Sequence, residues 1–169
     1  MAFLNKKMKS ILGNSVFSRI NFIICGTQKG GTTALDTYLR THPEICMANK
    51  KEVHYFDKDK YFKAQSPNYK KYHKYFSPSN ETQIIGEATP IYMYWNEAIA
   101  RIHRYNPKIK LIIILRNPID RAFSHWNMER DKGREKRSFL QAIVDEESKI
   151  NSSNHIQDKT FSYLDRGYY

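Results

Sequence analysis

The sequence predicts an α/β fold in which a central parallel sheet is flanked by helices. Two short runs rich in isoleucine, residues 20–25 (INFIIC) and 110–115 (KLIIIL), predict buried strands. A glycine-rich loop and a helical pattern follow the first run, and another helical pattern follows the second. Strands that alternate with helices are typical of a parallel sheet covered on both faces. The chain has 169 residues, which fits one domain.

Residue spacing and capping signals locate the other elements. A helix is expected to begin at Thr32 and to stop at Pro43, because proline cannot continue it. Another helix is expected after Asn117 and Pro118, which are favoured at the cap and at the first position of a helix. The remaining expected elements are a helix over residues 96–105, a helix from Ser138, a short strand over residues 84–86 and an extended piece near Glu52.

The composition favours a folded protein that attracts anions. The net charge is +11, from 28 Lys and Arg against 17 Asp and Glu, and it draws nucleotides, nucleic acid, acidic lipid or acidic polysaccharide alike. The two cysteines form no CxxC pair, which argues against a zinc site and a disulfide framework. No apolar run is long enough to span a membrane. We expect residues 1–19 to be a basic N-terminal extension, residues 20–169 to form the domain, and the protein to be cytoplasmic.

The segment after the first strand carries the residues of an anion-binding loop. Glycines let successive main-chain N–H groups point at an anion, and the N-terminal end of the following helix adds positive charge. A lysine supplies a mobile charge, and two threonines supply hydroxyl donors. An ordinary turn between a strand and a helix is the alternative. The candidate ligands of the anion are Gln28, Lys29, Gly30, Gly31, Thr32 and Thr33.

This loop differs from the common nucleoside-triphosphate pattern GxxxxGK[ST], in which lysine follows the last glycine. Here Lys29 precedes the glycine pair, and Thr32 occupies the place of that lysine. The strand over residues 111–115 is followed by Arg116 and not by an aspartate that could hold a metal ion. We therefore expect an anionic ligand that is bound without a metal.

Arg116 and Ser124 are candidates for a second anion site. In α/β sheets, ligands bind beyond the carboxyl ends of the strands, where both Arg116 and the loop are expected. A planar guanidinium can donate two hydrogen bonds to one phosphate. We expect the loop and Arg116 to hold one ligand that carries two separate anionic groups. A surface arginine and a helix serine are an equally good interpretation of these two residues taken alone.

Three ordered motifs resemble those of the sulfotransferase family. Residues 27–35 (TQKGGTTAL) resemble its 5′-phosphosulfate loop, and residues 115–124 (LRNPIDRAFS) resemble its 3′-phosphate motif. Residues 51–57 (KEVHYFD) resemble the segment that holds the catalytic carboxylate in the heparan sulfate glucosaminyl 3-O-sulfotransferase branch. The resemblance covers nearly the whole chain. It implies a P-loop-like three-layer fold, with a central parallel sheet flanked by helices.

The resemblance also implies a reaction. The donor would be 3′-phosphoadenosine 5′-phosphosulfate (PAPS), with Lys29 and the loop on its 5′ side, Arg116 and Ser124 on its 3′-phosphate, and no metal. The acceptor would be a hydroxyl or amine of a carbohydrate or small metabolite. Glu52 is the candidate general base, with a pKa that burial would raise. His54, expected on the same side of an extended segment, would orient the acceptor or assist as base, and Lys29 would offset charge on the leaving oxygen.

Some residues depart from the family pattern or allow two interpretations. Ala88 stands where many relatives have lysine, which weakens the case for a heparan-type acceptor. Residues 55–75, rich in Tyr and Lys, either line an acceptor cleft or form a solvated surface with packed rings. Glu87 is a candidate supporting residue of the site. The domain is expected to lack its C-terminal part, and a eukaryotic relative would lie in the Golgi behind a membrane anchor.

Three other functions fit parts of the sequence. The first is a truncated nucleotide-binding module without turnover. The second is a P-loop phosphotransferase, which the position of Lys29 opposes. The third is a nucleic-acid binder, which the charge permits, although the Lys and Arg are spread out and no recognition motif is present. No nucleic-acid partner is therefore expected.

Overall fold

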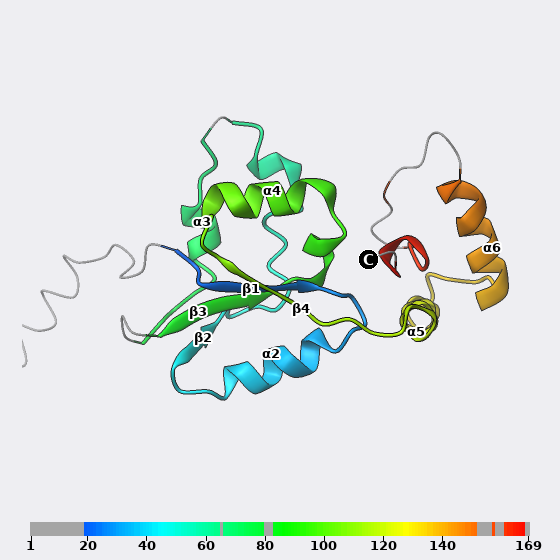
Figure 1. Cartoon of the computed structure of the whole chain (residues 1–169), viewed down its shortest axis with the longest axis horizontal. Helices are drawn as coiled ribbons and strands as arrows, with labels where there is room; N and C mark the ends of the chain where they lie inside the picture. The colour runs from blue at the N-terminus through cyan, green and yellow to red at the C-terminus, as the bar shows by residue number, and fades with distance from the viewer. Residues whose placement is uncertain (1–18, 65, 80–82, 152–156, 158–160, 168–169) are drawn as a thin grey trace, which may run out of the picture.

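The computed structural model describes residues 19–64, 66–79, 83–151, 157 and 161–167. The expected extension over residues 1–19 lies almost wholly outside the described residues. At the centre is a four-stranded sheet in the order β2-β3-β1-β4, with every pair of neighbouring strands parallel (Figure 1). The predicted α/β fold is confirmed. The strands are β1 (Phe22–Gly26), β2 (Ile45–Met47), β3 (Ile84–Ala88) and β4 (Lys110–Ile113).

The two faces of the sheet are covered by different helices. Ile23 and Cys25 of β1 pack in the large core cluster beneath α4 (Asn96–Tyr105), whose bounds are as expected. Phe22 and Ile24 point to the other face, where they pack beside α2 (Thr32–Arg40). Alternate residues of a strand point to opposite faces. Their burial on both sides therefore gives three layers, as Figure 1 shows.

Strand β4 lies at the edge of the sheet and is less buried than its apolar sequence predicts. Leu111 and Ile113 are 41% and 47% exposed. The strand ends at Ile113, two residues earlier than expected. Periodicity alone does not distinguish an edge strand from a central one, because the difference lies in the neighbouring strand.

A second group of helices lies beside the carboxyl ends of the strands. It consists of α5 (Pro118–Asp131), α6 (Phe139–Ile150) and the short helix η3 (Asp165–Gly167) (Figure 1). Both expected caps are present. The side-chain oxygen of Asn117 accepts a hydrogen bond from the N–H of Ile119 at 3.0 Å, and that of Ser138 accepts one from Gln141 at 3.3 Å. A separate core cluster of Ala122, Trp126, Ala142 and Tyr163 joins these helices.

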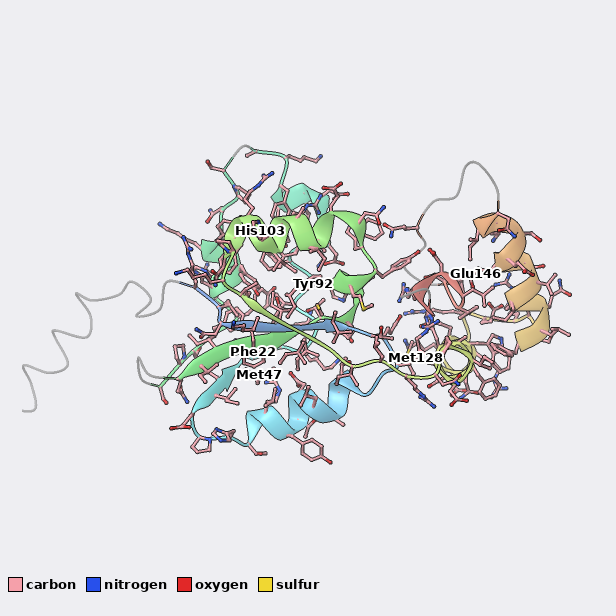
Figure 2. All side chains as sticks on the ribbon, viewed as in Figure 1. Phe22, Met47, Tyr92, His103, Met128 and Glu146 are labelled. Carbon is pink, nitrogen blue, oxygen red and sulfur yellow. The ribbon has the colours of Figure 1, made fainter. Side chains whose placement is uncertain are left out.

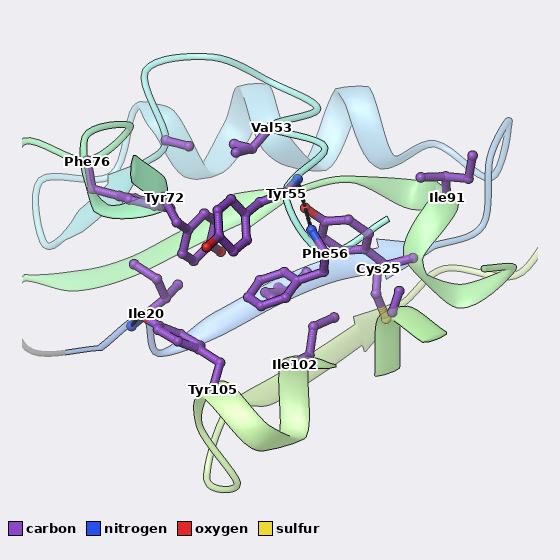
Figure 3. Packing of buried hydrophobic residues seen from close by; sticks show 14 of the residues in the cluster. Ile20, Cys25, Val53, Tyr55, Phe56, Tyr72, Phe76, Ile91, Ile102 and Tyr105 are labelled. Atoms are coloured by element: carbon purple, nitrogen blue, oxygen red, sulfur yellow. Dashed lines mark hydrogen bonds between the residues drawn. The ribbon is translucent and has the colours of Figure 1, made fainter. Parts of the chain in front are cut away.

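The aromatic residues after β2 pack against one another in the core. Tyr55 stacks on Tyr61 with 4.7 Å between ring centroids, and Tyr72 is completely buried. Figure 3 shows Tyr55, Phe56 and Tyr72 within one cluster. The rings therefore pack together as the second interpretation of residues 55–75 expects, but Tyr55, Phe56 and Tyr72 are buried and do not form the solvated surface it also expects. The short helices in this region and after β3 are η1 (Asp59–Tyr61), α3 (Lys70–His73) and η2 (Pro90–Met93).

Candidate functional site

The loop after β1, residues 26–33, is fastened to the edge strand and is called here the anion loop. The N–H of Thr27 donates to the carbonyl of Ile114 at 3.0 Å, and the N–H of Gly30 donates to the carbonyl of Thr27 at 2.9 Å. A Cβ at Gly30 would lie 2.4 Å from the Ile114 oxygen, so only glycine allows this close approach. Gly31 has a φ of +104°, a left-handed conformation that glycine adopts without a steric cost.

The anion loop leads into the N-terminal end of α2. The first N–H groups of a helix have no partner inside the helix, and Gly31 has no side chain to cap them. These donors and the positive end of the helix dipole favour an anion at this place. The hydroxyl of Thr32 belongs to a buried residue, whereas Thr33 is exposed. The anion loop thus has the local structure that its sequence predicts.

Arg116 lies directly against the anion loop. One guanidinium nitrogen, Nη1, donates a hydrogen bond to the carbonyl of Lys29 at 3.3 Å. Both elements border one cavity of about 350 Å³, called here the donor cavity after the nucleotide donor that the sequence motifs imply. The residues that line the donor cavity are Gln28, Lys29, Gly31, Thr32, Thr33, Lys51, Glu52, Pro90, Arg116, Ser124 and Met128.

Most of the predicted site residues line the donor cavity. Of the described residues predicted for the site, Gly30, His54 and the candidate supporting residue Glu87 do not line it. Lys51, Pro90 and Met128 line it and were not predicted. Lys51 directly precedes Glu52 in the sequence. Met128, which is labelled in Figure 2, lies one helical turn after Ser124 on α5, so helical spacing could have indicated Met128 as a lining residue.

Residues 51–57 form a second element of the candidate site and are called here the reactive segment, because they include Glu52, the predicted general base. The expected extended conformation is wrong, because Glu52 and His54 have φ values of 58° and 54°. The two side chains nevertheless meet, with 3.5 Å between His54 Nε2 and Glu52 Oε2. His54 Nδ1 lies 2.9 Å from Oδ2 of the buried Asp57. The imidazole is therefore held between two carboxylates, and Asp57 is a member of the site that was not predicted.

The expected pKa of Glu52 is corrected by this geometry. The contact with His54, together with Lys51 Nζ at 2.8 Å, lowers the pKa of Glu52 to about 2, although partial burial opposes the shift. The side chain is 45% exposed, so the opposite charges outweigh the burial that was expected to raise the pKa. Hydrogen bonds with Asp57 and then Glu52 raise the pKa of His54 to about 9. His54 is therefore an imidazolium near neutral pH, which favours an orienting role over a basic one.

The Gln28 side chain of the anion loop is held by a residue of the short helix η3. Arg166 is buried and donates a hydrogen bond to the side-chain oxygen of Gln28, and its guanidinium lies 4.9 Å from the centroid of the Tyr94 ring. The carboxylate of Glu146 accepts the N–H of Asp165 at 3.1 Å and so fixes the start of η3. No sequence signal connects Gln28 with a residue so far along the chain.

Two further features of the described residues concern metals and membranes. Within the part of the chain that the structure describes, no three His, Cys, Asp or Glu side chains are grouped so that they could hold a metal ion. None of the described helices combines the length and apolar character needed to cross a membrane.

The fold has three layers, with a parallel sheet between helices, and a glycine loop precedes the N-terminus of α2. A cationic cavity lies at the carboxyl ends of the strands. These features define a P-loop-like α/β protein whose candidate site suits anions. A model of the sulfotransferase domain matches residues 19–157. The chain therefore belongs to the sulfotransferase family.

Individual relatives agree with this assignment. The membrane-associated sulfotransferase kil1 of Dictyostelium discoideum is 33% identical over 135 residues, which cover 77% of this chain and 28% of that protein. Human heparan sulfate glucosamine 3-O-sulfotransferase 6 is 38% identical over 104 residues, which cover 62% and 29%. A sulfotransferase crystal structure from Alicyclobacillus acidocaldarius matches with a TM-score of 0.74 at 30% identity and covers 89% of this chain and 65% of that one. The matched part of the chain thus spans less than a third of either curated relative.

Proposed function

We propose that the chain binds PAPS in the donor cavity and transfers its sulfuryl group to a hydroxyl or amine of an acceptor. The observation that carries this proposal is the 3.3 Å hydrogen bond from Arg116 to the carbonyl of Lys29, because it brings the two predicted anion-binding elements to one cavity. A donor with one anionic group at its 5′ end and another at its 3′ position needs such a pair of sites. Membership of the sulfotransferase family supports the same donor.

The two ends of the donor would be held by different elements. The anion loop and the N-terminal end of α2 would bind the 5′-phosphosulfate through main-chain N–H groups, the hydroxyls of Thr32 and Thr33, and the charge of Lys29. Arg116 would bind the 3′-phosphate with its planar fork, and Ser124 on α5 would add a hydroxyl donor. All five of these side chains border the donor cavity.

The transfer would be an in-line displacement at sulfur. The acceptor oxygen forms a bond to sulfur while the bond between sulfur and the 5′-phosphate oxygen breaks, and adenosine 3′,5′-bisphosphate leaves. The acceptor proton passes to the carboxylate of Glu52, and Lys29 offsets the negative charge that grows on the leaving oxygen. His54, charged and held by Asp57, would orient Glu52 and the acceptor.

A pKa of about 2 makes Glu52 a weak base in the free protein. Lys51, which lowers that pKa, also borders the donor cavity and would be drawn to the sulfate and phosphate oxygens of a bound donor. An additional negative charge nearby raises the pKa of a carboxyl group. We infer that donor binding itself makes Glu52 more basic, which would link proton transfer to the presence of the donor.

The acceptor class is supported by the relatives. The human relative is named for the glucosamine of heparan sulfate, and a carbohydrate hydroxyl is therefore the first acceptor to test. At position 88 this chain has a buried alanine, whereas a lysine is usual in that branch. The missing positive charge favours a less charged sugar or a small metabolite as the alternative acceptor. The predicted cytoplasmic location stays a prediction, because one relative is named as membrane-associated.

The test is a sulfate-transfer assay with PAPS and a panel of sugars and small alcohols or amines. Glu52→Gln keeps the size of the side chain and removes its basicity, so it should retain bisphosphate binding and lose turnover. Glu44→Gln, the same change at an exposed glutamate, is the control and should turn over as the native chain does. Full turnover by Glu52→Gln would reject Glu52 as the base.

A nucleotide-binding module without turnover is the second candidate, because the matched part of the chain spans less than a third of its curated relatives. It predicts bisphosphate binding in calorimetry and no transfer with any acceptor in the panel. The same calorimetry with ATP and Mg²⁺ tests the P-loop phosphotransferase alternative, for which metal-dependent ATP binding is the expected result.

A further inference from the structure

Glu87 is a buried carboxylate on β3 that the reaction proposed above does not use. Its side chain has no exposed surface. Three hydroxyl groups donate to it: Tyr72 Oη at 2.5 Å, Thr89 Oγ1 at 2.6 Å and Tyr92 Oη at 3.4 Å. Burying a carboxyl group is costly unless such donors satisfy it, so a residue of this kind needs a physical reason for its place.

Tyr92 connects this carboxylate to the reactive segment. Its hydroxyl oxygen accepts the N–H of Tyr55 at 2.9 Å and the N–H of Phe56 at 3.4 Å. Those two peptides lie between His54 and Asp57, the pair that forms the 2.9 Å contact described above. Tyr92 itself is completely buried, and Figure 2 shows its place in the core. Its hydroxyl therefore supplies, away from solvent, the acceptor that these two main-chain N–H groups need.

The other part of the reactive segment is fixed by the main chain of β3. The N–H of Glu52 donates to the carbonyl of Ala88 at 2.9 Å, one residue after Glu87. Glu52 and His54 have left-handed φ values, which are sterically unfavourable for residues with a side chain. Such a conformation persists only where the surrounding structure holds it. The Ala88 carbonyl and the Tyr92 hydroxyl both accept main-chain N–H groups of this segment.

We propose that Glu87 and Tyr92 are positioning residues that fix the main chain of the reactive segment and thereby set the contact between His54 and the two carboxylates beside it. Glu87 fixes the direction of the Tyr92 hydroxyl, and that hydroxyl fixes the peptides between His54 and Asp57. The inference rests on the proposed function for its catalytic meaning. Its structural part concerns only the geometry of His54.

Tyr72 provides a matched control for Tyr92. Both are buried tyrosines that donate to the same oxygen of Glu87, and Tyr72 makes the shorter of the two bonds. The hydroxyl of Tyr92 also accepts main-chain hydrogen bonds from the reactive segment. Tyr72→Phe and Tyr92→Phe each remove one buried hydroxyl and leave the ring in the core. A merely structural role of the cluster predicts similar effects of the two changes.

The first measurement separates kcat from KM in the sulfate-transfer assay. Tyr92→Phe should lower kcat about 10-fold or more, because a small misplacement of catalytic groups costs one to two orders of magnitude. The KM for the donor should stay within about 3-fold, because the hydroxyl that Tyr92→Phe removes is bonded to Glu87 and to the reactive segment. Tyr72→Phe should leave both constants within about 3-fold of the native values.

The second measurement needs no activity. The imidazole of His54 is titrated by NMR, with its signal assigned by comparison with His54→Gln. The carboxylates of Glu52 and Asp57 contact His54, and that of Glu87 interacts with it electrostatically. Tyr92→Phe should move the pKa of His54 from about 9 toward its ordinary value, whereas Tyr72→Phe should leave it unchanged.

The two measurements distinguish a failure of the positioning role from a failure of the proposed function. Equal shifts of the His54 titration in Tyr72→Phe and Tyr92→Phe, or none in either, overturn the inference. Absence of turnover in the native chain rejects the proposed function, while the titration still decides the positioning role. If Tyr92→Phe fails to fold, Glu87→Asp replaces it, because this change keeps the negative charge near His54 and withdraws the carboxylate from the Tyr92 hydroxyl. A shifted His54 titration then supports the inference, and an unshifted one overturns it.

Discussion

Arg116 and Lys29 meet through a hydrogen bond of 3.3 Å from a guanidinium nitrogen to a main-chain carbonyl, although 87 positions separate them in the sequence. The pairing of β1 with β4 brings them together, because Gly26 lies opposite Ile113 and each strand is followed by one of the two residues. The sheet thus turns two distant sequence motifs into one cavity, and each motif can be tested by its effect on binding.

Replacing Lys29 with alanine should weaken binding of adenosine 3′,5′-bisphosphate about 10- to 100-fold. Removing a charged hydrogen-bond donor costs about 1.5–3 kcal/mol, and each 1.4 kcal/mol is a factor of ten in the Kd. Calorimetry at fixed salt measures the change. Lys108→Ala removes the same charge from a place before β4 that lies outside the donor cavity, and it should bind as the native chain does. Equal losses in both variants would mean that only the overall charge matters.

The two glycines of the anion loop should respond differently to alanine. The Cβ that Gly31→Ala adds would have no atom within 4 Å. The change should lower stability only because alanine disfavours the left-handed conformation, by about 1–2 kcal/mol. Gly30→Ala places a Cβ 2.4 Å from the Ile114 carbonyl, so the loop must move away from β4. Bisphosphate affinity should therefore fall further in Gly30→Ala. The reverse order of affinities would contradict the packing described for the loop.

The caps of α5 and α6 should separate stability from binding. Asn117→Ala and Ser138→Ala each remove a helix cap, which costs about 1 kcal/mol and lowers the Tm by about 3 °C. Only Asn117 follows Arg116 directly and caps the helix that carries Ser124. Bisphosphate affinity should thus fall in Asn117→Ala and stay unchanged in Ser138→Ala. Thermal denaturation measures the loss of stability, and calorimetry measures the bisphosphate affinity. Equal bisphosphate affinities of Asn117→Ala and Ser138→Ala would contradict the prediction.

His54 should make stability depend on alkaline pH. Its pKa in the folded protein, about 9, lies above its ordinary value of 6.5, so its stabilisation is complete below pH 6.5 and is lost as the pH rises through 9. The native chain should therefore lose more stability between pH 6 and pH 10 than His54→Gln does. Denaturant titrations at the two pH values measure this. The exposed His103→Gln should behave as the native chain, and a native-like pH loss in His54→Gln would refute the prediction.

Glu52 should contribute at the acidic end of the same profile. Its folded pKa of about 2 lies below the ordinary 4.5, so its stabilisation is present above pH 4.5 and is lost as the pH falls through 2. The side chain is 45% exposed, and solvent therefore reduces the size of the effect. Denaturant titrations of the native chain and Glu52→Gln at pH 5 and pH 2 measure it, and equal losses in the two proteins would contradict it.

The sequence predicted the elements whose signals are local. The strand and loop before Thr32, the bounds of α4 and the caps Asn117 and Ser138 follow from residues within a few positions of each other. The anion loop belongs to this class, because its glycines are required by its own φ values and by the strand beside it.

Features that depend on distant neighbours could not be predicted in the same way. The exposed edge position of β4, the hydrogen bond from Arg166 to Gln28 and the cluster around Glu87 arise from tertiary packing. For that reason the extended conformation and the raised pKa that were predicted for Glu52 are both wrong. An alternating pattern favours an extended segment, whereas bonds to Ala88 and Tyr92 hold the observed one.

The most direct test of the two-part donor site uses two ligands and two variants in calorimetry. Adenosine 3′,5′-bisphosphate carries both anionic groups, and adenosine 5′-monophosphate lacks the 3′-phosphate. Arg116→Ala should weaken binding of the bisphosphate about 10-fold or more and leave the monophosphate nearly unchanged, whereas Lys29→Ala should weaken both. If Arg116→Ala instead weakens both ligands equally, or neither, Arg116 does not bind the 3′-phosphate and the account of the site is wrong.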